Sequence, residues 1–103
     1  MILNTYLKAK VREIEITDAR LDYEGSLTLD EDIMDAMGVY EYEQVFVHSK
    51  HTKNRIMTYF LAGPRGTKIC QVNGGATQHF KKGDIVHLLV FAQSDRPIKP
   101  VII

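Results

Sequence analysis

The chain has 103 residues, of which 45% are hydrophobic and 25% charged, and its formal net charge is zero. This length suits one domain, residues 1–103, with enough residues to bury a core. The balanced charge gives no reason to expect a nucleic-acid partner, and no apolar run approaches the roughly 20 residues that span a bilayer. We expect no signal peptide after Met1, and the single cysteine excludes an internal disulfide. This composition favours a soluble cytoplasmic protein.

The first part of the chain has the alternating pattern of β-strands. Over residues 3–11, mostly apolar residues occupy the odd-numbered positions, whereas over 14–16 they occupy the even-numbered ones. This change of the face that carries them predicts a bulge near residues 12 and 13. We expect a turn at 17–20 and a short strand at 27–29.

A helix with clear end signals should follow that strand. Asp30 is a good N-cap, the apolar spacing predicts a helix over 31–37, and Gly38 sits where a C-cap belongs.

Pro97 and Pro100 should keep the tail out of sheet interiors. Further strands are expected at 44–48, 55–61, 68–72 and 85–91, separated by polar or glycine-rich turns. Many short strands with few helices predict a mainly β fold, a small closed barrel.

The dipeptide Gly25-Ser26, just before the strand at 27–29, is a candidate site of self-cleavage. Glycine leaves its carbonyl carbon uncrowded and tolerates strained backbone angles, and the following serine oxygen is one bond rotation from that carbon. Attack by Ser26 Oγ would turn the amide into an ester. Elimination and hydrolysis of the ester would leave a pyruvoyl group and ammonia. By itself, however, a Gly-Ser pair favours an ordinary turn.

Motifs elsewhere in the chain give this dipeptide a context. In chain order they are Lys8-Ala9-Lys10-Val11, Tyr23-Glu24-Gly25-Ser26, Arg55-Ile56-Met57-Thr58-Tyr59, Val72-Asn73-Gly74-Gly75-Ala76 and Gly83-Asp84-Ile85-Val86. In order and approximate spacing this set resembles the pyruvoyl-dependent aspartate 1-decarboxylases, from Met1 to about Phe91.

The resemblance implies a double-psi β-barrel with one or two short helices, assembled as a homotetramer with sites between subunits. It implies self-cleavage into residues 1–25 (the β chain) and 26–103 (the α chain), with a pyruvoyl cofactor made from Ser26. The implied reaction converts L-aspartate to β-alanine and CO₂ for pantothenate and coenzyme A biosynthesis. A pyruvoyl ketone would form a Schiff base with the substrate amine and accept the electrons released with CO₂, which no ordinary side chain can do.

The same resemblance assigns roles to side chains. Arg55 would grip a substrate carboxylate through two parallel hydrogen bonds, and Lys10 would add a second positive charge. Tyr59 would donate the proton that replaces CO₂, and Thr58 would polarise the scissile carbonyl. The turn Asn73-Gly74-Gly75-Ala76 would bind substrate with its side-chain amide and backbone N–H groups. By spacing alone, the two cations fit solvated strand residues and the turn fits an ordinary hairpin.

Thr58 and Tyr59 pose a geometric conflict, because adjacent residues of a regular strand point to opposite faces. They could share one site if the strand bends. Alternatively, they could serve neighbouring subunits from its two faces.

Other assignments of function remain open in the sequence. The histidines lack the spacing of metal ligands, so we expect no metal site, although His48 takes a place that is often aromatic in the family and could line the site. Cys70 reads as a small buried hydrophobe. The alternative function is a non-catalytic double-psi barrel used for binding or assembly. Within the enzyme class, glutamate is the alternative substrate.

Overall fold

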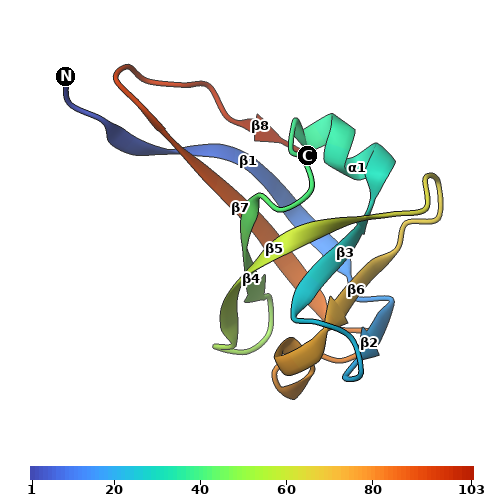
Figure 1. The fold of residues 1–103 in the computed structure, drawn as a ribbon. Coiled ribbons are helices and arrows are strands. Elements are labelled where there is room, and N and C mark those ends of the chain that lie inside the picture. Colours follow the sequence, from blue (N-terminus) through green and yellow to red (C-terminus); the bar gives the residue numbers. More distant parts are fainter.

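The computed structural model describes residues 1–103 and consists mainly of strands (Figure 1). They form one sheet in the order β2-β6-β3-β5-β4-β7-β1-β8. A helix, α1 (Glu31–Met37), and a 3₁₀ helix, η1 (Gly74–Gln78), complete the fold. The strands are β1 (Asn4–Glu15), β2 (Asp18–Arg20), β3 (Ser26–Asp30), β4 (Gln44–Ser49), β5 (Arg55–Gly63), β6 (Cys70–Asn73), β7 (Ile85–Ser94) and β8 (Val101–Ile102).

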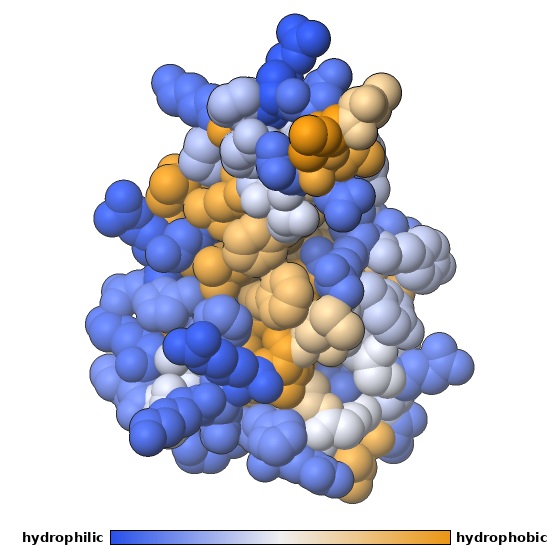
Figure 2. All heavy atoms as spheres, turned by 90° about the vertical axis from the view of Figure 1, so that its left-hand side faces the viewer, coloured by the Kyte–Doolittle hydropathy of each residue, from blue (hydrophilic) through white to orange (hydrophobic).

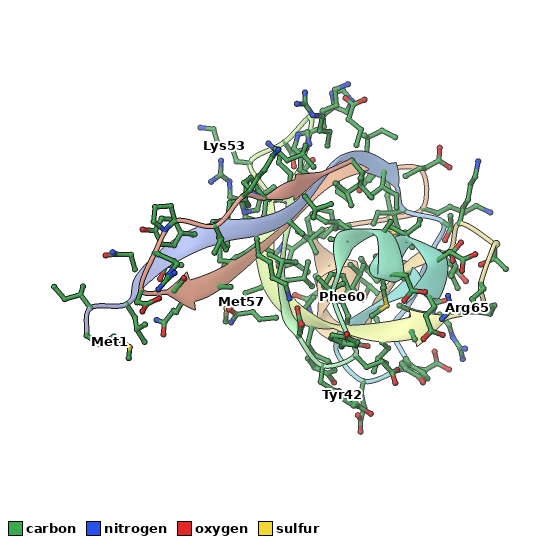
Figure 3. All side chains as sticks on the ribbon, turned by 90° about the horizontal axis from the view of Figure 1, so that it is seen from above. Met1, Tyr42, Lys53, Met57, Phe60 and Arg65 are labelled. Atoms are coloured by element: carbon green, nitrogen blue, oxygen red, sulfur yellow. The ribbon has the colours of Figure 1, made fainter.

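The sheet curls around its own core, so that β3 and β5 cross in front of β1 and β7 (Figure 1). Strand β5 joins two parts of the sheet. It pairs antiparallel with β4 up to Tyr59 and parallel with β3 from Phe60. Phe60 is fully buried in the interior, whereas Met57 stands on the outside (Figure 3). Along β5, Arg55 and Met57 in the half that pairs with β4 are exposed, whereas Phe60 and Gly63 in the half that pairs with β3 are buried.

Local signals set the limits of α1 as the sequence predicted. The Asp30 carboxylate accepts the N–H of Asp32 at 2.8 Å, and Gly38 ends the helix in the left-handed conformation with a φ of 74°. Met34 and Met37 are buried against the sheet. Neither this helix of 7 residues nor any other in the structure has the length and apolar character needed to cross a bilayer.

The turn predicted for residues 17–20 is wrong, because β2 forms there and pairs in parallel with β6. The Thr17 N–H donates to the Cys70 carbonyl at 2.8 Å, and the Thr17 hydroxyl accepts the Cys70 N–H at 2.8 Å. A short polar segment carries no readable period, so its conformation depends on the partner strand. The predicted bulge near residues 12 and 13 is confirmed by a register shift between Val11 and Ile14.

Strand β6 starts later than predicted, at Cys70 instead of Lys68. The Asp30 carboxylate accepts the N–H groups of Lys68 at 2.8 Å and Gly66 at 3.1 Å, and Lys68 adopts a φ of 59°. These backbone hydrogen bonds, the Lys68 bond first, lower the pKa of Asp30. The strands predicted at 27–29, 44–48, 55–61 and 85–91 are confirmed, with small extensions at their ends.

Candidate active site

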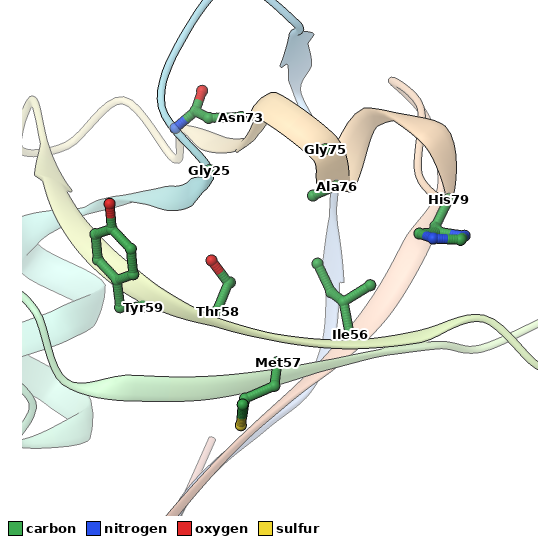
Figure 4. A pocket seen from close by; sticks show the side chains of 9 residues that line it. All are labelled: Gly25, Ile56, Met57, Thr58, Tyr59, Asn73, Gly75, Ala76 and His79. Carbon is green, nitrogen blue, oxygen red and sulfur yellow. The ribbon is translucent and has the colours of Figure 1, made fainter.

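A hollow of about 430 Å³ opens where the loop before β3 faces the middle of β5 (Figure 4). Its walls come from this loop, from β5 and from the end of β6 with η1. The residues around it are Gly25, Ile56, Met57, Thr58, Tyr59, Asn73, Gly75, Ala76 and His79. The structure thus brings together much of three motifs that are far apart in the sequence.

Ser26 lies directly beside this hollow and is fully buried. It is the first residue of β3 and lies opposite Asn73 of β6 in the antiparallel register. Its hydroxyl donates to the Glu24 carbonyl at 2.9 Å and accepts from the Asn73 side-chain amide at 2.9 Å. This hydrogen bond ties Oγ to the carbonyl of the residue that precedes Gly25, and Gly25 is the residue whose carbonyl carbon Oγ would attack.

The backbone conformation requires glycine at position 74 but not at position 25. Gly25 is not among the residues with positive φ, and a Cβ built on it would meet no atom within 4 Å. Gly74 has a φ of 64°, and a Cβ there would lie 2.7 Å from the Gly25 nitrogen and 2.9 Å from the Tyr23 carbonyl oxygen. Gly25 therefore does not adopt the left-handed conformation, whereas Gly74 does and allows a close backbone approach.

Thr58 and Tyr59 both border the hollow, which answers the conflict that their adjacency poses. Figure 4 shows their side chains and that of Ile56 on the side that faces Gly25, while Met57 points the opposite way. Tyr59 is the last residue of β5 that pairs with β4. The change of partner strand thus falls at the position where two neighbouring residues border the same hollow.

Lys10 and Arg55 do not reach this hollow. Arg55 pairs with His48 across β5 and β4, on the face opposite Ile56 and Thr58. Lys10 borders a separate hollow with Arg12, Glu13, His87 and Ile103. Both cations nevertheless act on His48, whose pKa is lowered first by partial burial and then by the charges of Arg55, His87 and Lys10. The chain therefore carries its predicted cations as a separate group on the outer face of the sheet.

Three residues near the site were missed from the sequence. Gln71 and Thr28 hydrogen-bond to Asn73, and His79 borders the hollow beyond Ala76. Strand alternation could have found the first two, because Gln71 precedes Asn73 by two positions and Thr28 follows Ser26 by two. Nothing in the sequence singled out His79.

Other reactive groups offer no competing site. No group of His, Cys, Asp and Glu side chains is arranged to hold a metal ion. Cys70 is buried in β6, and burial raises its pKa to about 12. Its thiol therefore stays protonated near neutral pH and is a poor nucleophile.

Comparison with known proteins identifies the family. The family model described as aspartate decarboxylase matches residues 2–103. The chain belongs to the aspartate decarboxylase family. It is 41% identical over 92 residues to the aspartate 1-decarboxylase of Exiguobacterium sibiricum, covering 89% of this chain and 72% of that one. It is also 39% identical over 106 residues to the aspartate 1-decarboxylase of Phenylobacterium zucineum, and this match covers 99% of this chain and 90% of that one. The predicted family membership, and with it the carboxy-lyase class, is confirmed.

A solved structure independently supports the fold. A computationally designed protein, msDPBB_sym2, superimposes with a TM-score of 0.53, covering 82% of this chain and 96% of the other. Only 15% of the aligned residues are identical, so this likeness concerns the fold alone. The predicted double-psi β-barrel is confirmed for this member of the aspartate decarboxylase family.

Proposed function

We propose that this chain is a pyruvoyl-dependent aspartate 1-decarboxylase that cleaves itself between Gly25 and Ser26. The observation that carries the proposal is the buried Ser26 hydroxyl, next to Gly25 in the chain, which hydrogen bonds to the Glu24 carbonyl and from the Asn73 amide hold in place. Gly25 itself borders a hollow that also contains Thr58 and Tyr59. A nucleophile, an uncrowded carbonyl and hydroxyl groups are thus collected at one place.

Self-cleavage needs only groups of the chain and water. Ser26 Oγ bonds to the Gly25 carbonyl carbon, the Gly25–Ser26 C–N bond breaks, and the hydroxyl proton passes to the Ser26 nitrogen. Loss of the Ser26 Cα proton and cleavage of its Cβ–Oγ bond release residues 1–25 with a terminal carboxylate. Water then replaces the nitrogen as ammonia leaves, and residues 26–103 begin with a pyruvoyl group.

The residues at this place fit such a group. Gly74 lets the backbone of the preceding loop approach closely, and the Asn73 side-chain amide stays aimed at the position that the Ser26 oxygen vacates. The pyruvoyl group supplies the electron sink for decarboxylation. Thr58 holds the scissile carbonyl before cleavage, and Tyr59 delivers a proton to the substrate carbon afterwards.

Substrate carboxylates would be bound across a subunit boundary. Lys10 and Arg55 lie on the outer face of the sheet, together with an apolar cluster of Phe46, Met57 and Phe91. Met57 is 60% and Phe91 42% exposed, and the Phe46 and Phe91 rings meet edge to face at 5.6 Å. Figure 2 shows apolar side chains gathered in a band between polar ones on this side of the molecule.

Such a face suits contact with another copy of the chain, because a monomer gains nothing from exposed aromatic side chains. In the homotetramer that we propose, this face of one subunit meets the hollow of its neighbour. Lys10 and Arg55 of one subunit then supply positive charge for the two carboxylates of L-aspartate in the next. The Asn73–Ala76 segment binds the substrate from the side of the hollow.

The product β-alanine would serve pantothenate and coenzyme A biosynthesis, in the cytoplasm. The alternative function, a non-catalytic barrel, would not require a buried serine whose hydroxyl is bonded to the preceding segment of its own chain. A binding module predicts an intact chain, whereas the decarboxylase predicts two fragments.

Mass spectrometry of the purified protein tests the proposal. We expect fragments of residues 1–25 and 26–103, the second lacking an amino group, and release of β-alanine from L-aspartate in preference to any product from L-glutamate. Ser26→Ala should give one intact and inactive chain. An intact wild-type chain, or cleavage that persists in Ser26→Ala, would contradict the mechanism.

A further inference from the structure

The Asn73 side chain is not used in the way its position favours. Asn73 stands at the N-cap of η1, where an asparagine side chain ordinarily accepts a hydrogen bond from the first turn. Here it makes no capping bond. Its amide points sideways and donates to Ser26 Oγ at 2.9 Å and to Thr28 Oγ1 at 3.0 Å.

A four-residue cluster surrounds this amide on one face of the β3–β6 ladder. Ser26 pairs with Asn73 and Thr28 pairs with Gln71 in the antiparallel register. Gln71 Nε2 donates to Asn73 Oδ1 at 2.8 Å. Both hydrogens and the oxygen of the Asn73 amide are therefore engaged, and no buried polar side-chain atom lacks a partner.

The Glu24 carbonyl fixes the direction of these bonds. A carbonyl can only accept, so the Ser26 hydroxyl proton points at Glu24. Ser26 Oγ must then accept from Asn73, which requires the NH₂ end of the amide to face it. Reversing the Asn73 amide would set its oxygen against Ser26 Oγ and its NH₂ against the Gln71 NH₂.

We propose that Gln71 and Thr28 are positioning residues for self-cleavage, because they hold the Asn73 amide in the one orientation that donates to Ser26 Oγ. This inference rests on the proposed function. Gln71 selects the orientation by donating to the Asn73 oxygen, and Thr28 takes the second amide hydrogen. Without them the buried amide can rotate or reverse, and the attacking oxygen loses its fixed position. Such misplacement is costly in an intramolecular attack.

The test follows cleavage of freshly translated full-length chains, separated by mass, over a range of pH. Gln71→Met keeps the length of the side chain but cannot donate, so we expect cleavage to slow about tenfold or more, the rate equivalent of one hydrogen bond. Gln71→Glu can donate only when its carboxyl is protonated. Its rate relative to wild type should therefore rise as the pH falls from about 8 to about 4.5.

The ionisable groups around position 71 also bear on that pH profile. Asp18 and Arg20 of β2 pair with Gln71 and Asn73, and Glu24 and Tyr59 lie near Ser26. Since wild type contains the same groups, the ratio of the two rates isolates the introduced carboxyl. Gln93→Glu, an exposed change on β7, is the matched control and should follow the wild-type profile.

Position 28 provides a second pair of variants. Thr28→Val keeps the shape but removes the acceptor, so cleavage should slow. Thr28→Ser restores an oxygen and should recover most of the wild-type rate. A purely structural contribution of Thr28 would instead favour valine over serine, since valine keeps both branches of the side chain.

Each outcome is decisive. Wild-type rates in Gln71→Met and Gln71→Glu at every pH, or equal slowing without pH dependence, would overturn the positioning role while leaving self-cleavage intact. Slow cleavage in Thr28→Ser with normal cleavage in Thr28→Val would overturn the role of Thr28. A wild-type chain that never cleaves would overturn the proposed function together with this inference.

Discussion

Gly74→Ala should damage the site more than any other glycine substitution near it. The added Cβ would lie 2.7 Å from the nitrogen and 2.9 Å from the Cα of Gly25, and 2.9 Å from the carbonyl oxygen of Tyr23. All three are backbone atoms, which cannot swing aside like the end of a flexible side chain. Either η1 or the loop that carries the scissile bond must move.

The size of the effect follows from two costs. A non-glycine residue at the Gly74 φ of 64° costs about 1–2 kcal/mol. Overpacking by one methyl group against fixed neighbours adds about 1–3 kcal/mol. We therefore expect the free energy of unfolding to fall by about 2–5 kcal/mol, and cleavage to slow by about 10²-fold because Gly25 is displaced from Ser26.

Gly75→Ala is the matched control, one residue away. Gly75 has no positive φ, and its Cβ would meet no atom within 4 Å. An alanine there should be neutral or stabilise the fold by up to about 1 kcal/mol. It should also leave cleavage unchanged.

Denaturant unfolding at one fixed protein concentration, in a Ser26→Ala background that keeps every chain intact, measures the stability difference. Cleavage is then timed by mass in chains that retain Ser26. Equal stability and equal cleavage in Gly74→Ala and Gly75→Ala would refute the reasoning, because it depends on close contact at one glycine and open space at the other.

Further predictions concern substrate binding, proton transfer, cleavage and stability. The Arg55→Lys protein should still cleave itself, but its kcat/KM for L-aspartate should fall about 10²-fold, because lysine cannot form the two parallel hydrogen bonds of a guanidinium. Steady-state kinetics measure this change, and unchanged kinetics would show that Arg55 is not in the site. Tyr59→Phe should cleave yet form no β-alanine, and turnover at the wild-type rate would assign the proton to another donor. Thr58→Val should keep the fold but stay intact by mass, so normal cleavage would exclude its hydroxyl. Asp30→Asn should lower Tm near neutral pH. That difference should shrink as the pH falls below about 4, since a carboxylate with a lowered pKa stabilises the fold only while ionised; a constant difference in Tm across pH would contradict it.

Local features of this protein could be predicted from the sequence alone. The limits of α1 follow from Asp30, Gly38 and the helical spacing between them, and most strands follow from alternation. These signals act between residues a few positions apart, so the local sequence contains them in full. The family was also predictable, because its motifs keep their order along the chain.

The tertiary structure decided the relations between distant residues. Asn73 and Ser26 are 47 positions apart, and only the β3–β6 register makes them partners. Thr58 and Tyr59 border one hollow at the place where β5 changes its partner strand. Strand β2 exists because β6 lies beside it. The family resemblance could point to candidate site residues, but a pairing partner can lie anywhere along the chain, so only the folded sheet could show which of them meet.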